Sequence, residues 1–160
     1  MKKLVKMMLP LFFAAASFAQ SNATWQRIVG VITAPGVSNP VAGIASGALP
    51  WTTTSGTATV DFTSGVVTFN VTGLVLVGGN ASGTPDGVTS VKGTLVCSPG
   101  TGDQAIIDTP AVPLSAQGNA AFTGHFEGSA PASCTNPLFL IRTLGNAWIA
   151  TGAVRDSTPL

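Results

Sequence analysis

Apolar and polar residues alternate along much of this chain with the period of two that is typical of β-strands. The clearest case spans residues 57–70, where Ala58 and Val60 alternate with polar residues before a Ser-Gly turn, and Val67 and Phe69 continue the alternation after it. This pattern predicts a β-hairpin whose two apolar faces lie on one core. Its threonine and aspartate side chains are expected to face water or a shallow groove.

Seven further segments rich in Val, Ile, Thr and Phe are separated by Gly and Pro, which are typical of turns. These segments span residues 25–33, 74–77, 88–97, 105–108, 120–127, 138–143 and 147–154. The last two are apolar on both faces, so we expect them to lie centrally in the sheet. Long loops are expected at 34–50, 78–87 and 98–103, and little or no helix is expected because Gly or Pro interrupts every helical period.

About eight or nine short strands predict an all-β fold with one domain. The favoured interpretation is a single antiparallel β-sandwich, with a small closed barrel as the alternative. Residues 20–160 form this domain, with an ordered core at roughly 24–155. A transmembrane barrel is not expected, because its strands need about ten residues and girdles of aromatic side chains, whereas this chain has three Trp and no Tyr.

The first 19 residues are typical of a signal peptide. Lys2, Lys3 and Lys6 precede an apolar run at 9–16, and Ala19 ends a small-residue cleavage motif. The apolar run is shorter than the roughly 20 residues that a spanning helix needs, so the processed protein is not expected to span a membrane. We therefore expect an exported protein, secreted or periplasmic, and the lysine-rich start suggests a bacterial source.

Removal of the signal peptide changes the charge of the chain. It leaves four basic residues against six acidic ones, a net charge of about −2 in place of +1. Nucleic acid is not expected as a partner, because binding a phosphate backbone requires clustered Lys and Arg. A weakly charged surface has little long-range steering, so a neutral glycan or an extracellular protein is the expected kind of partner. The pattern leaves the oligomeric state open.

Cys97 and Cys134 are the only cysteines. In an exported chain an even count favours a disulfide, and the alternation in 88–97 places Cys97 on the inward face. A disulfide that closes such a loop stabilises the fold by about 4 kcal/mol in the chain-entropy model.

Candidate catalytic chemistry is sparse. His125 is the only histidine and Glu127 lies two residues further along the same predicted strand, which makes them the best available acid–base pair. Two polar residues on the solvent side of a strand would give the same pattern. One His and two bridged Cys are too few ligands for zinc, and no metal site or cofactor is expected.

The three tryptophans are candidate ligand-stacking residues, because an exposed Trp often stacks on a sugar ring or anchors a partner. Trp51 follows Pro50 and precedes a threonine run, so of the three it is the best candidate for exposure, although plugging the edge of the core is favoured over ligand binding. Trp25, at the start of the first predicted strand, is a second candidate for binding. Trp148 lies in an apolar run and is expected in the core.

These features favour a non-catalytic secreted β-module with a structural or binding role, whose contact surface is built from residues 34–56 and 78–87. The ligand is not defined by the pattern. Two alternatives remain: a small secreted hydrolase that uses His125 and Glu127, and a secreted protease inhibitor that presents a proline-rich loop.

Overall fold

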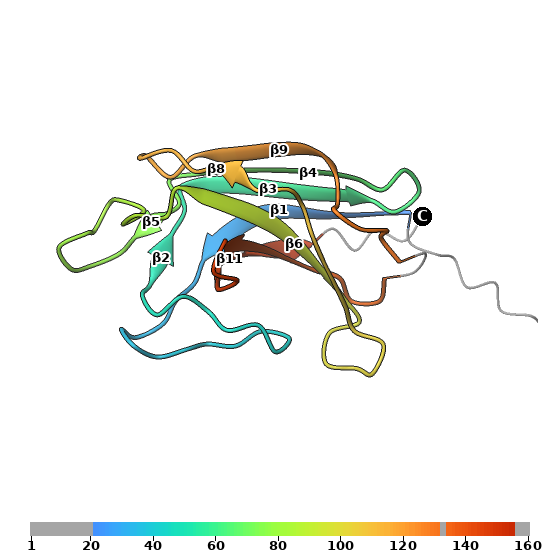
Figure 1. Cartoon of the computed structure of the whole chain (residues 1–160), viewed down its shortest axis with the longest axis horizontal. Helices are drawn as coiled ribbons and strands as arrows, with labels where there is room; N and C mark the ends of the chain where they lie inside the picture. The colour runs from blue at the N-terminus through green and yellow to red at the C-terminus, as the bar shows by residue number, and fades with distance from the viewer. Residues whose placement is uncertain (1–20, 132–133, 156–160) are drawn as a thin grey trace, which may run out of the picture.

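The computed structural model describes residues 21–131 and 134–155 (Figure 1). Within these ranges the chain forms strands, turns and irregular segments, and no helix. The strands are β1 (Asn22–Gly30), β2 (Trp51–Thr52), β3 (Ser55–Asp61), β4 (Val66–Thr72), β5 (Val75–Leu76), β6 (Ser90–Cys97), β7 (Ala105–Asp108), β8 (Val112–Pro113), β9 (Ala120–His125), β10 (Leu138–Thr143) and β11 (Trp148–Arg155). The all-β prediction is confirmed, whereas the predicted signal peptide at 1–19 lies outside the described residues.

One curled antiparallel sheet makes up most of the fold. Its strands follow the order β7-β6-β10-β11-β1-β3-β4-β9, with β8 also paired to β6, and β2 and β5 form a separate pair. The curl gives the sheet the shape of a half-barrel (Figure 1). The curl brings the end of β7 next to the residues that follow β9, where the Glu127 backbone N–H donates to the Asp108 carbonyl at 2.8 Å.

The predicted hairpin is confirmed as β3 and β4. These strands pair from Ser55 opposite Thr72 to Val60 opposite Val67. Buried and exposed residues alternate strictly along most of both strands, because each has one face on the core and the other in solvent.

Most of strand β10 and the first three residues of β11 are buried on both faces. Phe139, Leu140 and Ile141 are fully buried in β10, and Trp148 is 3% exposed in β11. The irregular segment 31–50 packs against the start of β11, where the Trp148 indole N–H donates to the Asn39 carbonyl at 2.9 Å and its backbone N–H to the Ala45 carbonyl at 3.0 Å. The prediction that these two apolar runs lie centrally is thus confirmed.

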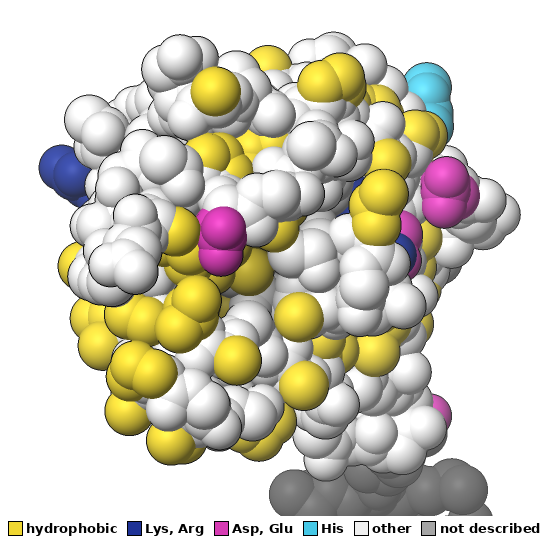
Figure 2. Space-filling view, turned by 60° about the vertical axis from the view of Figure 1, so that its left-hand side comes forward, with side chains coloured by type: hydrophobic (Ala, Val, Ile, Leu, Met, Phe, Trp, Pro, Cys, Tyr) yellow, Lys and Arg dark blue, Asp and Glu magenta, His cyan; other side chains and the backbone are white. Residues whose placement is uncertain are grey.

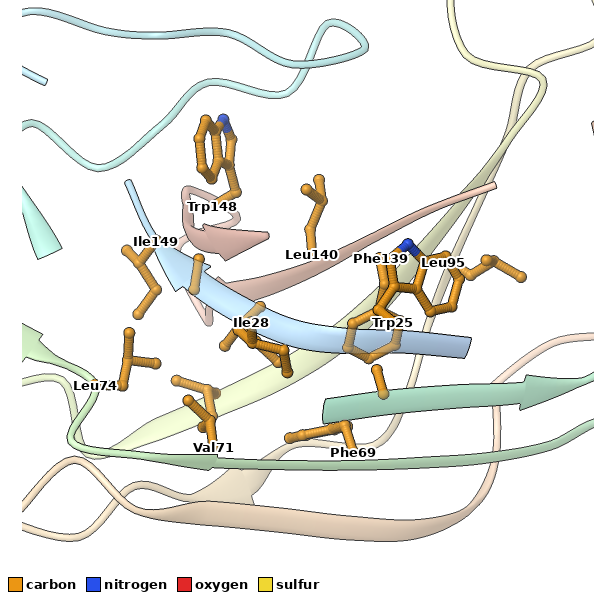
Figure 3. Close-up of a cluster of buried hydrophobic side chains, with 14 of the residues drawn as sticks. Trp25, Ile28, Phe69, Val71, Leu74, Leu95, Phe139, Leu140, Trp148 and Ile149 are labelled. Carbon is orange, nitrogen blue, oxygen red and sulfur yellow. The ribbon is translucent and has the colours of Figure 1, made fainter. Parts of the chain in front are cut away.

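Aromatic side chains from separate strands meet inside the curl (Figure 3). The Phe139 ring lies 5.5 Å from that of Trp25 and 5.7 Å from that of Phe69, between ring centroids. Gly93 of β6 makes room for this contact, since a Cβ there would lie 2.7 Å from Phe139 and 2.9 Å from Phe69. This cluster joins strands from opposite parts of the sheet.

The Cys97–Cys134 disulfide is present, as predicted. It links the end of β6 to the segment that precedes β10. Most predicted strands are found within a few residues of their predicted bounds, but two short ones, β2 and β8, were not predicted. Both contain a Pro or directly follow one, so the sequence pattern indicated turns there.

Candidate functional site

A groove opens on the outer surface where β1 and β3 stop pairing. Their register runs from Asn22 opposite Asp61 to Trp25 opposite Ala58 and then ends, although β1 remains paired with β11 as far as Gly30. The resulting groove has a volume of about 480 Å³.

Local irregularities in β1 and β11 shape one wall of this groove. Buried and exposed residues cease to alternate in the middle of β1. Gln26 and Arg27 are both exposed there, between the buried Trp25 and Ile28. Opposite this break, Val154 has a φ of 51°. A β-branched residue in this left-handed region is a genuine outlier, and such outliers cluster at functional sites.

The groove is lined mainly by hydroxyl and amide side chains, supplied by residues 53–57, Gln26 and Asn70. Val29 and Val154 add exposed apolar surface, at 40% and 64% exposure, and Arg27 is the only charged residue in the lining. Ile28 and Gly56 form its floor, where a Cβ on Gly56 would lie 2.9 Å from the Ile28 Cβ. This lining can hydrogen-bond a polar ligand, but it holds no carboxylate or imidazole for acid–base catalysis.

Neighbouring polar side chains are held in place by hydrogen bonds across strands. The Asn70 amide donates to the Thr57 hydroxyl at 3.0 Å, and the Ser55 and Thr72 hydroxyls lie 2.6 Å apart. The Thr53 hydroxyl, in the segment just before β3, donates to the Ile28 carbonyl of β1 at 2.6 Å. These contacts give the groove wall a fixed arrangement of donors and acceptors.

A second polar site is a cluster of charged residues on the outer side of β6, β7 and β10. Asp108 accepts hydrogen bonds from Lys92 Nζ at 2.6 Å, from the Thr94 hydroxyl at 2.6 Å and from Arg142 Nη1 at 3.1 Å. Both cations also donate to Asn146. Arg142 Nε donates to the Asn146 backbone carbonyl at 3.0 Å, and Lys92 Nζ donates to the Asn146 side-chain oxygen at 2.8 Å.

The Asp108 carboxylate is stabilised in its charged form. Partial burial by itself raises the pKa of Asp108, because desolvation disfavours the ion. The hydrogen bonds from Lys92 and Thr94, with the positive charges of Lys92 and Arg142, outweigh this and hold the pKa below its usual value of 3.8. A carboxylate held in this way is a poor proton donor near neutral pH.

Beside the cluster lies a cavity of about 310 Å³, between residues 43–45 and the β10–β11 turn at 145–147, with Arg142 in its lining. Lys92 and Arg142 each interrupt an apolar strand pattern, which is the signal that could have drawn attention to them. Their association with Asp108 was not predictable, because the three residues come from separate strands.

The predicted acid–base pair lies elsewhere. His125 ends β9 opposite Val66 and is exposed, and Glu127 is also exposed, with the buried Phe126 between them. Neither residue lines the groove or the cavity described above. The Glu127 backbone, rather than its side chain, makes the contact with Asp108.

The tryptophans are all buried, so Trp51 is not presented as an exposed stacking residue, which agrees with the alternative that it plugs the edge of the core. Trp51 is 6% exposed, Trp25 2% and Trp148 3%. Trp51 lies inward because its strand pairs with β5, where Trp51 stands opposite Leu76, and because the Trp51 backbone N–H donates to the Val31 carbonyl. The threonine run that follows it, not the indole, reaches the outer surface in the groove.

The loops predicted as a contact surface lie at one end of the molecule. Figure 2 shows this end, where apolar patches are separated by few charged side chains. Leu49 in the first of these loops is exposed at 40%, and Ile32 and Val77, which precede the two loops in the sequence, are exposed at 87% and 48%. Part of the 34–50 segment is turned inward, since Ile44 and Ser46 are each only 7% exposed.

The described residues contain no group of three or more His, Cys, Asp or Glu side chains that could hold a metal ion. No helix among them has the length and apolar character needed to cross a membrane.

No protein-family model matches the chain, and neither a curated protein nor a solved structure is found to be similar to it. A functional assignment therefore depends on the chemistry of the groove and of the charged cluster.

Proposed function

We propose that this chain is an exported, non-catalytic β-module that binds a neutral glycan in the groove between β1 and β3. The observation that carries the proposal is the groove lining, which combines hydroxyl and amide groups with two exposed valines and holds no carboxylate. Hydroxyls and amides both donate and accept hydrogen bonds, as sugar hydroxyls do. Val29 and Val154 offer apolar surface to the C–H face of a sugar ring.

Two further observations support a binding role. The strained φ of Val154 lies in the groove wall, and backbone strain is retained where the surrounding structure fixes it, often at ligand sites. The charged residues that lie close together, Lys92, Asp108 and Arg142, are engaged with one another rather than arranged around a nucleophile. The disulfide supports export, because such bonds persist in oxidising compartments.

The test is a glycan array with the mature, oxidised protein and two matched valine variants. Thr57→Val removes a hydroxyl from the groove while it keeps the shape and β-propensity of the side chain. Thr59→Val makes the same change two residues along the exposed face of β3, outside the groove. We expect saturable binding of a neutral oligosaccharide that weakens about fivefold or more in Thr57→Val, because a hydrogen bond contributes about 1 kcal/mol.

Thr59→Val is expected to bind like the unchanged protein. Equal losses in both variants would place the ligand on the threonine face rather than in the groove. The absence of binding to any neutral glycan would overturn the proposal.

A further inference from the structure

We propose that the cavity beside Arg142 binds the carboxylate group of a small organic anion. This site is separate from the β1–β3 groove and does not depend on the proposed glycan binding. The cavity lies on the other half of the sheet, between residues 43–45 and the turn at 145–147.

The first support is that one N–H group of the Arg142 guanidinium has no partner in the part of the protein that the structure describes. The Arg142 side chain is 9% exposed. Its Nε donates to the Asn146 carbonyl and its Nη1 to Asp108, but among the described residues its Nη2 has no hydrogen-bond partner. Solvent reaches Nη2, and Arg142 lines the cavity, so this N–H group is free to donate a hydrogen bond to a ligand there.

The second support is the charge balance of the cluster. Lys92 and Arg142 carry two positive charges, and the Asp108 carboxylate neutralises one of them. One net positive charge therefore remains in a region where these side chains are only 9% to 23% exposed. Burial makes an uncompensated charge costly, so a bound monoanion would stabilise the cluster.

The shape of the cavity selects the kind of anion. Apart from Arg142 and Asn146 its lining consists of small or apolar residues, including Ile44, Ala45 and Ala147, so the body of the ligand would meet mostly apolar surface. At about 310 Å³ the cavity has room for a free organic acid or one acidic sugar residue. A planar carboxylate matches the fork of the guanidinium, which a tetrahedral anion fits less directly.

The experiment titrates the oxidised protein with acetate, galacturonate, sulfate and the uncharged galactose at constant ionic strength, and follows backbone amide shifts by NMR. We expect saturable shifts at 43–45 and 145–147 with a carboxylate, and none there with galactose. Binding of acetate as tightly as galacturonate indicates a free acid as ligand, whereas galacturonate alone indicates an acidic sugar. Either result supports the site.

Three variants locate the binding. Arg142→Gln removes the guanidinium, and we expect it to weaken carboxylate binding about tenfold or more, as for a lost charged hydrogen bond. Ala45→Glu keeps the cluster intact and places a competing carboxylate at the rim from an exposed position, with the same expected loss. Ala48→Glu adds the same charge on the same segment outside the cavity lining and should bind normally.

Three results would overturn the inference: no carboxylate binding by the unchanged protein, binding that persists in Ala45→Glu, or sulfate bound as tightly as the carboxylates. The first would mean that Arg142 serves only as an ion-pair partner. None of these results affects the glycan groove, which the Thr57→Val comparison tests separately.

Discussion

The two halves of the curled sheet differ in what lies on their outer faces. Across β1, β3, β4 and β9, the threonines of one row stand directly opposite one another: Thr24, Thr59, Thr68 and Thr123. This half is open, and its outer face meets solvent. In the other half, called here the covered half, segment 31–50 packs against the start of β11, and the outer side of β6, β7 and β10 holds the Lys92–Asp108–Arg142 cluster.

This difference indicates that the two halves have different roles, one in ligand recognition and the other in the stability of the fold. The open half repeats hydroxyls that bond across strands, and it bears the groove where the pairing of β1 and β3 ends. The covered half buries apolar side chains on both faces and encloses its charges. Changes to the covered half are therefore expected to cost stability, whereas changes to the open face are expected to affect binding more than folding.

Loss of the disulfide should have the largest effect. The Cys97–Cys134 bond closes a loop with a sequence separation of 37 and belongs to the covered half. We expect the double variant with alanine at both positions to lose about 4 kcal/mol of unfolding free energy, because its unfolded chain is no longer constrained. Urea denaturation measures this difference.

A reducing agent serves as the control, since it should destabilise the original protein and leave the double variant unchanged. A loss below about 1 kcal/mol would show that the covered half holds together without the crosslink.

The outer faces themselves can be compared by a matched pair of truncations. Leu140 points away from the interior on β10 (Figure 3) and is nevertheless fully buried. Leu140→Ala should destabilise the fold by about 3 kcal/mol, because it leaves a cavity beneath the covering residues. Thr59→Ala, on the open outer face of β3, should cost less than about 1 kcal/mol, which reflects β-propensity alone.

Thermal and urea denaturation of the two variants provide the comparison. Similar losses would contradict it, because they would mean that the outer face of β10 is not shielded more than that of β3.

Much of this contrast was visible in the sequence as local periodicity. The alternation of Ala58, Val60, Val67 and Phe69 predicted a half-exposed hairpin, and the continuous apolar runs predicted that β10 and β11 are central. Hydrophobic period reports how many faces of a strand are buried, so both predictions required only neighbouring residues. The disulfide was predictable because only two cysteines exist.

The candidate sites required information that periodicity lacks. Asp108 contacts Lys92 and Arg142 across separations of 16 and 34 residues, and only the strand order brings these residues together. The groove arises where two paired strands diverge, which no local pattern records. The burial of Trp51 could not be fixed from its neighbours for a related reason, because it depends on pairing with the distant Leu76.

The cluster provides the last and smallest test, which concerns the charges of the covered half. Asp108→Asn leaves Lys92 and Arg142 without a counter-charge, and at neutral pH we expect a loss of about 1 to 2 kcal/mol. This is below the 3–5 kcal/mol typical of a fully buried broken pair, because the side chains of Lys92 and Asp108 keep 16% and 23% exposure. The control is Asp86→Asn, an exposed aspartate at a φ of 43° that Asn tolerates.

The stability difference between the unchanged protein and Asp108→Asn is expected to depend on pH. The pKa of Asp108 is lower in the folded protein than its ordinary value of 3.8, so the folded state stabilises the carboxylate. That stability is fully present above about pH 4, which is near the unfolded pKa of Asp, and is lost as the pH falls towards the folded pKa. The gap in unfolding free energy between the unchanged protein and Asp108→Asn should therefore narrow on acidification below pH 4. A gap that stays constant with pH would mean that the amide loses packing or hydrogen bonds rather than charge, and the enclosed charges would then contribute nothing to the stability of the covered half.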